Sequence, residues 1–289
     1  MSLVLLGGAW LIKRAPMKMQ GSSATATATT QAPTAVPGPP QLRGERIPVE
    51  QVKAQIDADV FNAVGPRAYY ISRMQIRPPG DALEYVDQLL ALSGKGDATA
   101  TFGIHLAVMD CKNSIRGSSD PQAASFANAS QHMSMLAAAE RKLGECAALL
   151  LDKQLMSIDW ITLAAEQGSI EAKLAYGMDA EAVLGSPGER LANPGKAVAW
   201  RETTLAYLQE VAATGSLDAM ARLSNAYEQG VIVEKNPEFA YAYALVSNRI
   251  MPDPNREHLV RSMEEGLSMK QQESAAALSH QIYQSCCQP

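Results

Sequence analysis

The chain has 289 residues, and 47% of them are apolar, which is enough to bury the core of one large domain or two ordinary ones. Its 25 Lys and Arg against 30 Asp and Glu give a formal charge of -5, and no basic cluster of useful size occurs, which argues against a nucleic-acid-binding protein. With only four Phe and three Trp, the core must be built from small and aliphatic side chains, as in helix-on-helix packing.

Residues 1–16 contain a continuous apolar run, Leu3–Ile12, which as a helix would be roughly 15 Å long at about 1.5 Å per residue. A bilayer core needs about twice that length. Lys13 and Arg14 follow the run, whereas the positive residues of a secretory signal precede it. We therefore expect a partial membrane anchor or signal remnant whose true start lies upstream; a buried first helix is the alternative.

Residues 17–48 are rich in Ala, Thr, Ser, Gln and Pro, with scarcely any large apolar side chain. Such a segment cannot bury enough surface to offset its ordering entropy, so we expect a disordered linker. Stretched at about 3.1 Å per residue, it would span on the order of 100 Å. An apolar end, a linker and a folded domain form the layout of a membrane-tethered protein. Together with paired cysteines, this layout favours the bacterial periplasm, with an anchor in the inner membrane.

Residues 49–289 show helical spacing nearly throughout, and no alternating run is long enough to predict a strand. The expected fold class is therefore all-α. One pattern occurs three times, a glycine followed four residues later by an alanine and an apolar helix; it starts at Gly96, Gly168 and Gly215. The pattern predicts antiparallel helix hairpins, in which the first helix ends at a glycine with positive φ.

The residue after each of these glycines is suited to cap the second helix of its hairpin: Asp97, Ser169 and Ser216. Small alanines on both helices allow a close approach. One hairpin cannot bury its apolar face alone, so we expect an alpha-alpha superhelix, a solenoid of stacked hairpins.

The spacing of the glycines locates the other elements. Gly96 and Gly168 lie 72 residues apart, which is two periods of about 36 residues. Gly168 and Gly215 lie 47 residues apart, and the turn residues of 185–195 predict a loop inserted between them. Residues 121–151 predict a further, degenerate hairpin with a break at Gly144. Residues 257–287 have an amphipathic pattern that predicts one or two capping helices.

The stretch Ala212–Val231, and above all Tyr227–Val231, resembles the Sel-one-like repeat, a relative of the tetratricopeptide repeat. Trp160–Gly168 is similar to the same family, and Asn236–Tyr243 is similar to its next first helix. The resemblance is clear over residues 155–250.

Weaker similarity to the family begins at about residue 81. The resemblance implies a scaffold of the bacterial envelope type, which holds a protein or peptide partner on a concave helical face. The repeat positions that it assigns a structural role are Gly96, Trp160, Gly168, Gly177, Gly215, Ala219, Tyr227 and Gly230.

Four cysteines are the candidates for disulfides: Cys111, Cys146, Cys286 and Cys287. No C-x-x-C pair and no two histidines at ligand spacing occur, so we predict neither a metal site nor a cofactor. In an oxidising compartment we favour a Cys111–Cys146 bond between neighbouring helices. Adjacent Cys286 and Cys287 cannot easily bridge each other without strain. We expect one bridge from this pair to a nearby helix and one spare thiol; a redox or intermolecular disulfide is the alternative.

No catalytic constellation emerges from the sequence. Gly188 and Gly195 are spaced too widely for a phosphate loop, and Ala197 stands where that loop needs a hydroxyl. His105 lies beside apolar residues of an expected helix, which favours a structural histidine over a general base.

We therefore predict a non-catalytic adaptor that binds a protein or peptide. The candidates for partner binding are exposed side chains of first helices: Arg201, Tyr207 and Glu210. One alternative is an envelope enzyme, or an accessory of one, that uses an acidic site near the inserted loop. A second alternative is a structural spacer without a specific ligand.

Overall fold

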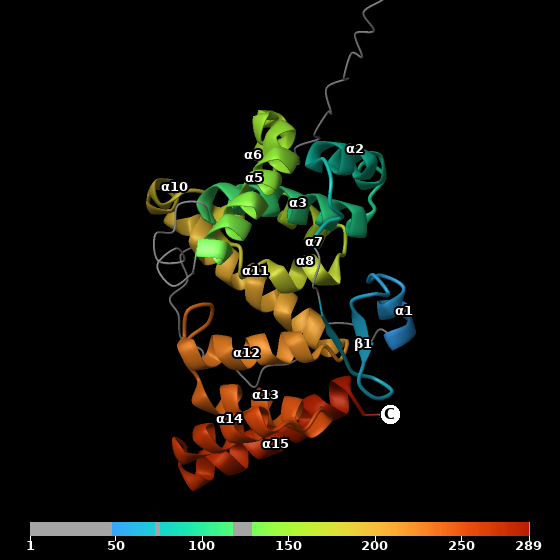
Figure 1. The fold of residues 1–289 in the computed structure, drawn as a ribbon. Helices are drawn as coiled ribbons and strands as arrows, with labels where there is room; N and C mark the ends of the chain where they lie inside the picture. The colour runs from blue at the N-terminus through green and yellow to red at the C-terminus, as the bar shows by residue number, and fades with distance from the viewer. Residues whose placement is uncertain (1–47, 73–75, 118–128, 289) are drawn as a thin grey trace, which may run out of the picture. The chain divides into compact units, whose positions relative to one another are not determined.

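The computed structural model describes residues 48–72, 76–117 and 129–288 (Figure 1). Within these residues the chain forms fourteen helices and one two-stranded hairpin, so the protein is largely helical. The elements follow in this order: α1 Val49–Lys53, β1 Phe61–Ala63, β2 Tyr69–Ile71, α2 Ala82–Ser93, α3 Ala98–Gly117, α5 Ala129–Leu151, α6 Lys153–Ser157, α7 Trp160–Glu166, α8 Ile170–Ala175, α9 Ala180–Leu184, α10 Pro187–Ala192, α11 Pro194–Ala213, α12 Leu217–Gln229, α13 Pro237–Ile250, α14 Pro254–Glu265 and α15 Met269–Cys286.

Three pairs of helices form hairpins that turn at a glycine: α2 with α3, α7 with α8, and α11 with α12. Gly96, Gly168 and Gly215 have φ angles of +89°, +103° and +91°. Residues with a side chain rarely adopt such angles, because Cβ then lies too close to the following carbonyl oxygen. The positive φ predicted from the glycine pattern is therefore confirmed at all three turns.

The residue after each glycine caps the helix that follows. Asp97 Oδ1, Ser169 Oγ and Ser216 Oγ each accept a hydrogen bond from the backbone N–H three residues further on, at 2.9, 3.1 and 3.3 Å. These bonds satisfy N–H groups that have no partner inside the helix. All three predicted caps are confirmed.

The hairpins pack on one another through their second helices. Helix α3 contacts α7, α8 contacts α11, and α12 contacts α13 (Figure 1). The buried apolar side chains fall into three clusters. The N-terminal cluster includes Val86 and Leu149, the middle cluster includes Ile161 and Ala172, and the C-terminal cluster includes Leu223.

A short β hairpin, β1 with β2, is present where the sequence predicted no strand. The two strands pair antiparallel, with Asn62 opposite Tyr70. Each strand has three residues, which is too short for the alternation of apolar and polar residues to be recognised. The prediction of an exclusively helical fold is therefore corrected at this point.

The β hairpin lies against the turn between α11 and α12. The backbone N–H of Tyr69 donates to the carbonyl oxygen of Gly215 at 3.2 Å, and the buried Tyr69 hydroxyl lies 2.7 Å from Thr214 Oγ1. A Cβ atom on Gly215 would lie 1.9 Å from the carbonyl oxygen of Arg67. Gly215 is therefore required both by its φ angle and by the close approach of the hairpin.

Two sequence-based boundaries are wrong. The break expected at Gly144 is absent, because this residue lies inside α5; a single glycine weakens a helix without ending it. The loop expected at 185–195 contains the short helix α10 and the start of α11, each with a proline in its first turn. Proline fits there because the first N–H groups of a helix have no partner inside it.

Two helices, α14 and α15, end the chain, and both contact α13. Of the helices described, none is both long enough and apolar enough to span a bilayer. The predicted anchor, residues 1–16, and the linker up to residue 47 lie outside the described residues, as do residues 118–128.

Candidate functional site

A groove of about 220 Å³ opens between α8, α11 and α12. Leu174 belongs to α8, and Val231 and Ile232 belong to the segment after α12. The residues that line it are Leu174, Gly177, Met178, Trp200, Thr204, Leu208, Arg222, Asn225, Ala226, Gln229, Val231 and Ile232.

The walls of the groove follow from helical spacing. Helix α11 contributes Trp200, Thr204 and Leu208, which recur every four residues and therefore share one face of the helix. Gly177, just after α8, lets this face come close, because a Cβ atom there would lie 2.4 Å from Thr204 Cγ2. Trp200 Nε1 donates to the carbonyl oxygen of Tyr176 at 3.3 Å, which holds the ring at the edge of the groove.

Arg222 holds α12 against the end of α8. Its guanidinium donates to the carbonyl oxygen of Leu174 at 2.8 Å and contacts Met178 Sδ. Burial lowers the pKa of Arg222 from its usual value, and the charge of Asp218 opposes this shift. Burial likewise raises the pKa of Asp218, although its carboxylate accepts a 2.8 Å bond from the Ile71 N–H. The carboxylate of Asp218 thus supplies a negative charge near the Arg222 guanidinium.

Two side-chain amides of α12 face the groove, Asn225 and Gln229. Both side chains are exposed, and neither forms a hydrogen bond with another described residue. Each amide therefore keeps two donors and an acceptor free for a ligand. Met178 and Val231, also exposed, supply apolar surface beside them. Sequence reasoning missed these residues, although the spacing of two amides four residues apart on the expected helix is a usable signal.

The three residues predicted to bind a partner lie in different surroundings. Arg201 is exposed, as expected. Tyr207 and Glu210 are half-buried and join α11 to α8: the Tyr207 ring contacts Tyr176 edge-on at 5.2 Å, and Glu210 pairs with Lys173. Of the three, only Arg201 is fully on the surface, while Tyr207 and Glu210 also take part in the contact between consecutive hairpins.

The disulfide predicted between Cys111 and Cys146 is present and joins α3 to α5, with a Cα–Cα distance of 5.4 Å. The expectation for Cys286 and Cys287 is wrong, because these neighbours are bonded to each other, and no free thiol is found in the described residues. Cys287 has φ -129° and ψ -6° and lies beyond the last helical residue. Of the bonded pair, Cys286 is thus the last residue of α15 and only Cys287 has left helical geometry.

Next to the Cys111–Cys146 bond lies a buried arginine that the sequence did not indicate. The side chain of Arg77 is 1% exposed and donates to Asp110 at 3.0 Å and to Glu145 at 2.8 Å. Its hydrogen bond lowers the pKa of Glu145 from the usual value. Asp110 and the two cysteines also lie within 4.8 Å of one another. Because the sulfurs are bonded together and Asp110 pairs with Arg77 and Lys142, this arrangement fits a structural role.

His105 is buried in α3, stacked on Phe102 at 5.7 Å. Its Nε2 lies 3.6 Å from Asp179 Oδ2, an oxygen that accepts no hydrogen bond in the structure. Burial lowers the pKa of His105 to about 4, more than the nearby Asp179 charge raises it. The imidazole is therefore neutral at pH 7, in line with the structural histidine that the sequence indicates.

The carboxylates near residues 185–195 serve as helix caps. Glu189 accepts a hydrogen bond from the Ser186 N–H at 2.7 Å, which lowers the pKa of Glu189, and Asp179 Oδ1 caps α9 through the Ala182 N–H at 3.0 Å. Asp179 also lines a cavity of about 310 Å³, to which no described residue contributes a hydroxyl or thiol side chain. Glu189 and Oδ1 of Asp179 are therefore accounted for by local structure, whereas Oδ2 of Asp179 has no hydrogen-bond partner.

Comparison with protein-family models gives no match, and comparison with curated protein sequences gives no significant similarity.

Proposed function

We propose that the protein is a non-catalytic adaptor, and that the groove between α8, α11 and α12 binds an extended peptide segment of a partner protein. The observation that supports this most directly is the pair of unpartnered amides, Asn225 and Gln229, beside exposed apolar side chains. An extended peptide offers a row of N–H and C=O groups that need partners when they are bound.

The spacing of the two amides matches the repeat of an extended chain. Four residues along a helix cover about 6 Å, and two residues of an extended peptide cover about 6.6 Å. Asn225 and Gln229 can therefore each bond the backbone at alternate residues of one peptide. The peptide residue between the two bonded residues could then place an aliphatic side chain in the groove. There it would contact Leu174, Leu208 and Ile232, which line the groove.

The order of contacts supports a solenoid of Sel-one-like hairpins. Each second helix contacts the first helix of the next hairpin, α3 with α7, α8 with α11, and α12 with α13. Gly230 ends α12 in the left-handed conformation, and Asn236 caps α13. Stacked hairpins leave a continuous helical face for a ligand.

The cysteines support an oxidising compartment, for which we propose the bacterial periplasm with a membrane tether in residues 1–16. All four cysteines are in disulfides, and such bonds persist outside the reducing cytosol.

A peptide library displayed on phage tests the adaptor. We expect the purified protein to enrich peptides with an aliphatic residue, and fluorescence anisotropy to give their affinity. The double substitution Asn225→Ala and Gln229→Ala removes the backbone partners and should weaken binding about tenfold, at about 0.5–1.5 kcal/mol per hydrogen bond.

The matched control is Asn255→Ala with Gln281→Ala, which removes two exposed amides of α14 and α15 and should leave the affinity unchanged. An equal loss in both variants contradicts a site in the groove. Failure to enrich any peptide favours the spacer, and turnover of a generic ester or glycan favours the enzyme.

A further inference from the structure

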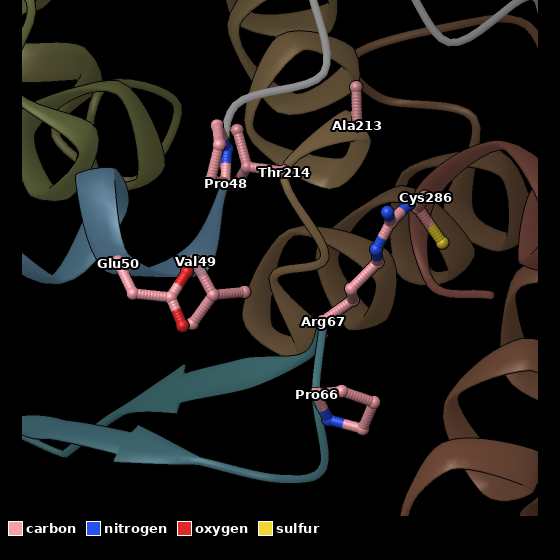
Figure 2. A pocket seen from close by; sticks show the side chains of 8 residues that line it. All are labelled: Pro48, Val49, Glu50, Pro66, Arg67, Ala213, Thr214 and Cys286. Atoms are coloured by element: carbon pink, nitrogen blue, oxygen red, sulfur yellow. The ribbon is translucent and has the colours of Figure 1, made fainter. Parts of the chain in front are cut away.

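A second cavity, of about 250 Å³, lies at the end of α15 and reaches the Cys286–Cys287 disulfide. Cys286 lines the cavity together with Pro48, Val49, Glu50, Ala213 and Thr214 (Figure 2). Cys287 is bonded to Cys286 and is not part of the lining. Cys286 is therefore the cysteine of the pair that a reagent in this cavity reaches.

Arg67 places a positive charge in this cavity. The residue lies between β1 and β2, and Figure 2 shows its side chain extending towards Cys286. It is exposed and makes no ion pair with a described carboxylate. A guanidinium near sulfur stabilises thiolate over thiol. Because a thiolate is both the attacking and the leaving group in disulfide exchange, Arg67 favours that reaction here.

The other disulfide is closed to solvent. Cys111 and Cys146 are 0% exposed, whereas Cys286 and Cys287 are each 5% exposed. Neither Cys111 nor Cys146 lines the cavity that Cys286 lines. The two bonds therefore differ in access within one molecule.

We propose that this cavity is a thiol–disulfide exchange site, at which a small dithiol reduces the Cys286–Cys287 bond. One thiolate of the dithiol attacks Cys286 Sγ; a mixed disulfide forms, the Cys286–Cys287 bond breaks, and its electron pair leaves on Cys287 Sγ, which takes up a proton. The second thiolate of the dithiol then attacks the first sulfur of the dithiol, which is bonded to Cys286. This step closes the dithiol into a ring and releases Cys286 as a thiolate beside Arg67. Two electrons pass from the dithiol, which leaves as a cyclic disulfide, to the protein, which gains two thiols.

The test uses the native full chain and dithiothreitol as the dithiol. Samples are quenched with an alkylating maleimide, and mass spectrometry of the peptides gives the rate for each cysteine. We expect Cys286 and Cys287 to be labelled at least about tenfold faster than Cys111 and Cys146, because attack requires access.

Three variants test the role of Arg67. Arg67→Ala should slow the labelling of Cys286 and Cys287 about three- to tenfold, while Arg67→Lys stays within about twofold, because the charge is kept. The matched control is Arg261→Ala, an exposed arginine of α14, which should not change the rate. Added salt should slow the wild type and not Arg67→Ala, since ions screen the charge.

Three results would overturn the proposal. The first is labelling of Cys286 and Cys287 before any dithiol is added, which means that the bond is absent. The second is equal rates for the two pairs. The third is a rate for folded Arg67→Ala, checked by circular dichroism, equal to that of the wild type together with no salt dependence in the wild type.

Discussion

At the scale of the residue, the burial of His105 in α3 makes the stability of the folded protein depend on pH. The imidazole is buried between Phe102 and Asp179, and burial lowers its pKa from 6.5 to about 4. Below pH 6.5 the unfolded chain takes up a proton that the folded chain does not yet bind. The stability that neutral His105 contributes is therefore complete above pH 6.5 and is lost as the pH falls towards 4.

We predict that the free energy of unfolding falls by up to about 1.4 kcal/mol per pH unit within this window because of His105. The variant His105→Gln cannot take up the proton and should lose this part of the pH dependence. Urea unfolding at several pH values between 6.5 and 4 measures it. The control His258→Gln changes an exposed histidine of α14 and should keep the slope; an unchanged slope in His105→Gln contradicts the prediction.

At the scale of the element, one turn supports both a helix hairpin and a β hairpin. Gly215 has φ +91°, and its carbonyl oxygen accepts the Tyr69 N–H at 3.2 Å. Gly168 occupies the same position in the preceding hairpin, but no atom lies within 4 Å of a Cβ built there. Both positions therefore require a residue that adopts a positive φ angle. Only position 215 also lacks the space for a Cβ atom.

We predict that Gly215→Ala lowers the free energy of unfolding by about 3 kcal/mol, because strain at positive φ adds to the clash with the Arg67 carbonyl. Gly168→Ala should cost about 1–2 kcal/mol for the positive φ alone. Gly144→Ala is the control, since this exposed helical glycine has open space around it, and should raise stability by up to about 1 kcal/mol. Urea unfolding followed by circular dichroism gives the order; equal effects at Gly215 and Gly168 would show that the β hairpin does not press on the turn.

At the scale of the whole molecule, the buried apolar side chains form three separate clusters. We therefore expect the stability of a hairpin to depend more on its neighbours than on distant hairpins. Leu223 of α12 is fully buried in the C-terminal cluster, which also contains the β hairpin and α15. The N-terminal cluster, around Val86, has its own disulfide. If the hairpins form the proposed stack of repeats, stability is approximately a sum of local terms.

We predict that Leu223→Ala, which creates a cavity worth about 2–5 kcal/mol, destabilises α11 to α15 and spares α2 and α3. Native-state hydrogen exchange measures this, because amides report the opening of their own cooperative unit. Exchange should speed up about tenfold or more in α12 and α13 and change little in α3. Equal acceleration in α3 means that the chain unfolds as one unit and contradicts the prediction.

The sequence predicted the local features that have a local cause. The positive φ of Gly168 and the cap at Ser216 each depend on a few neighbouring residues, and each is present. The Cys111–Cys146 bond was also predicted, because both residues lie on adjacent long helices. Strands of three residues carry too short a pattern, so the β hairpin was missed.

What the sequence determined by itself was the helical class and the glycine turns, because backbone conformation and helix caps are set by contacts within a few residues. Only the tertiary structure decided which faces stay open. Tyr207 and Glu210 are half-buried by contacts with Tyr176 and Lys173, while Asn225 and Gln229 remain free in the groove. The physical reason is that exposure depends on residues distant in the chain, as does the meeting of Arg67 with Cys286 in one cavity.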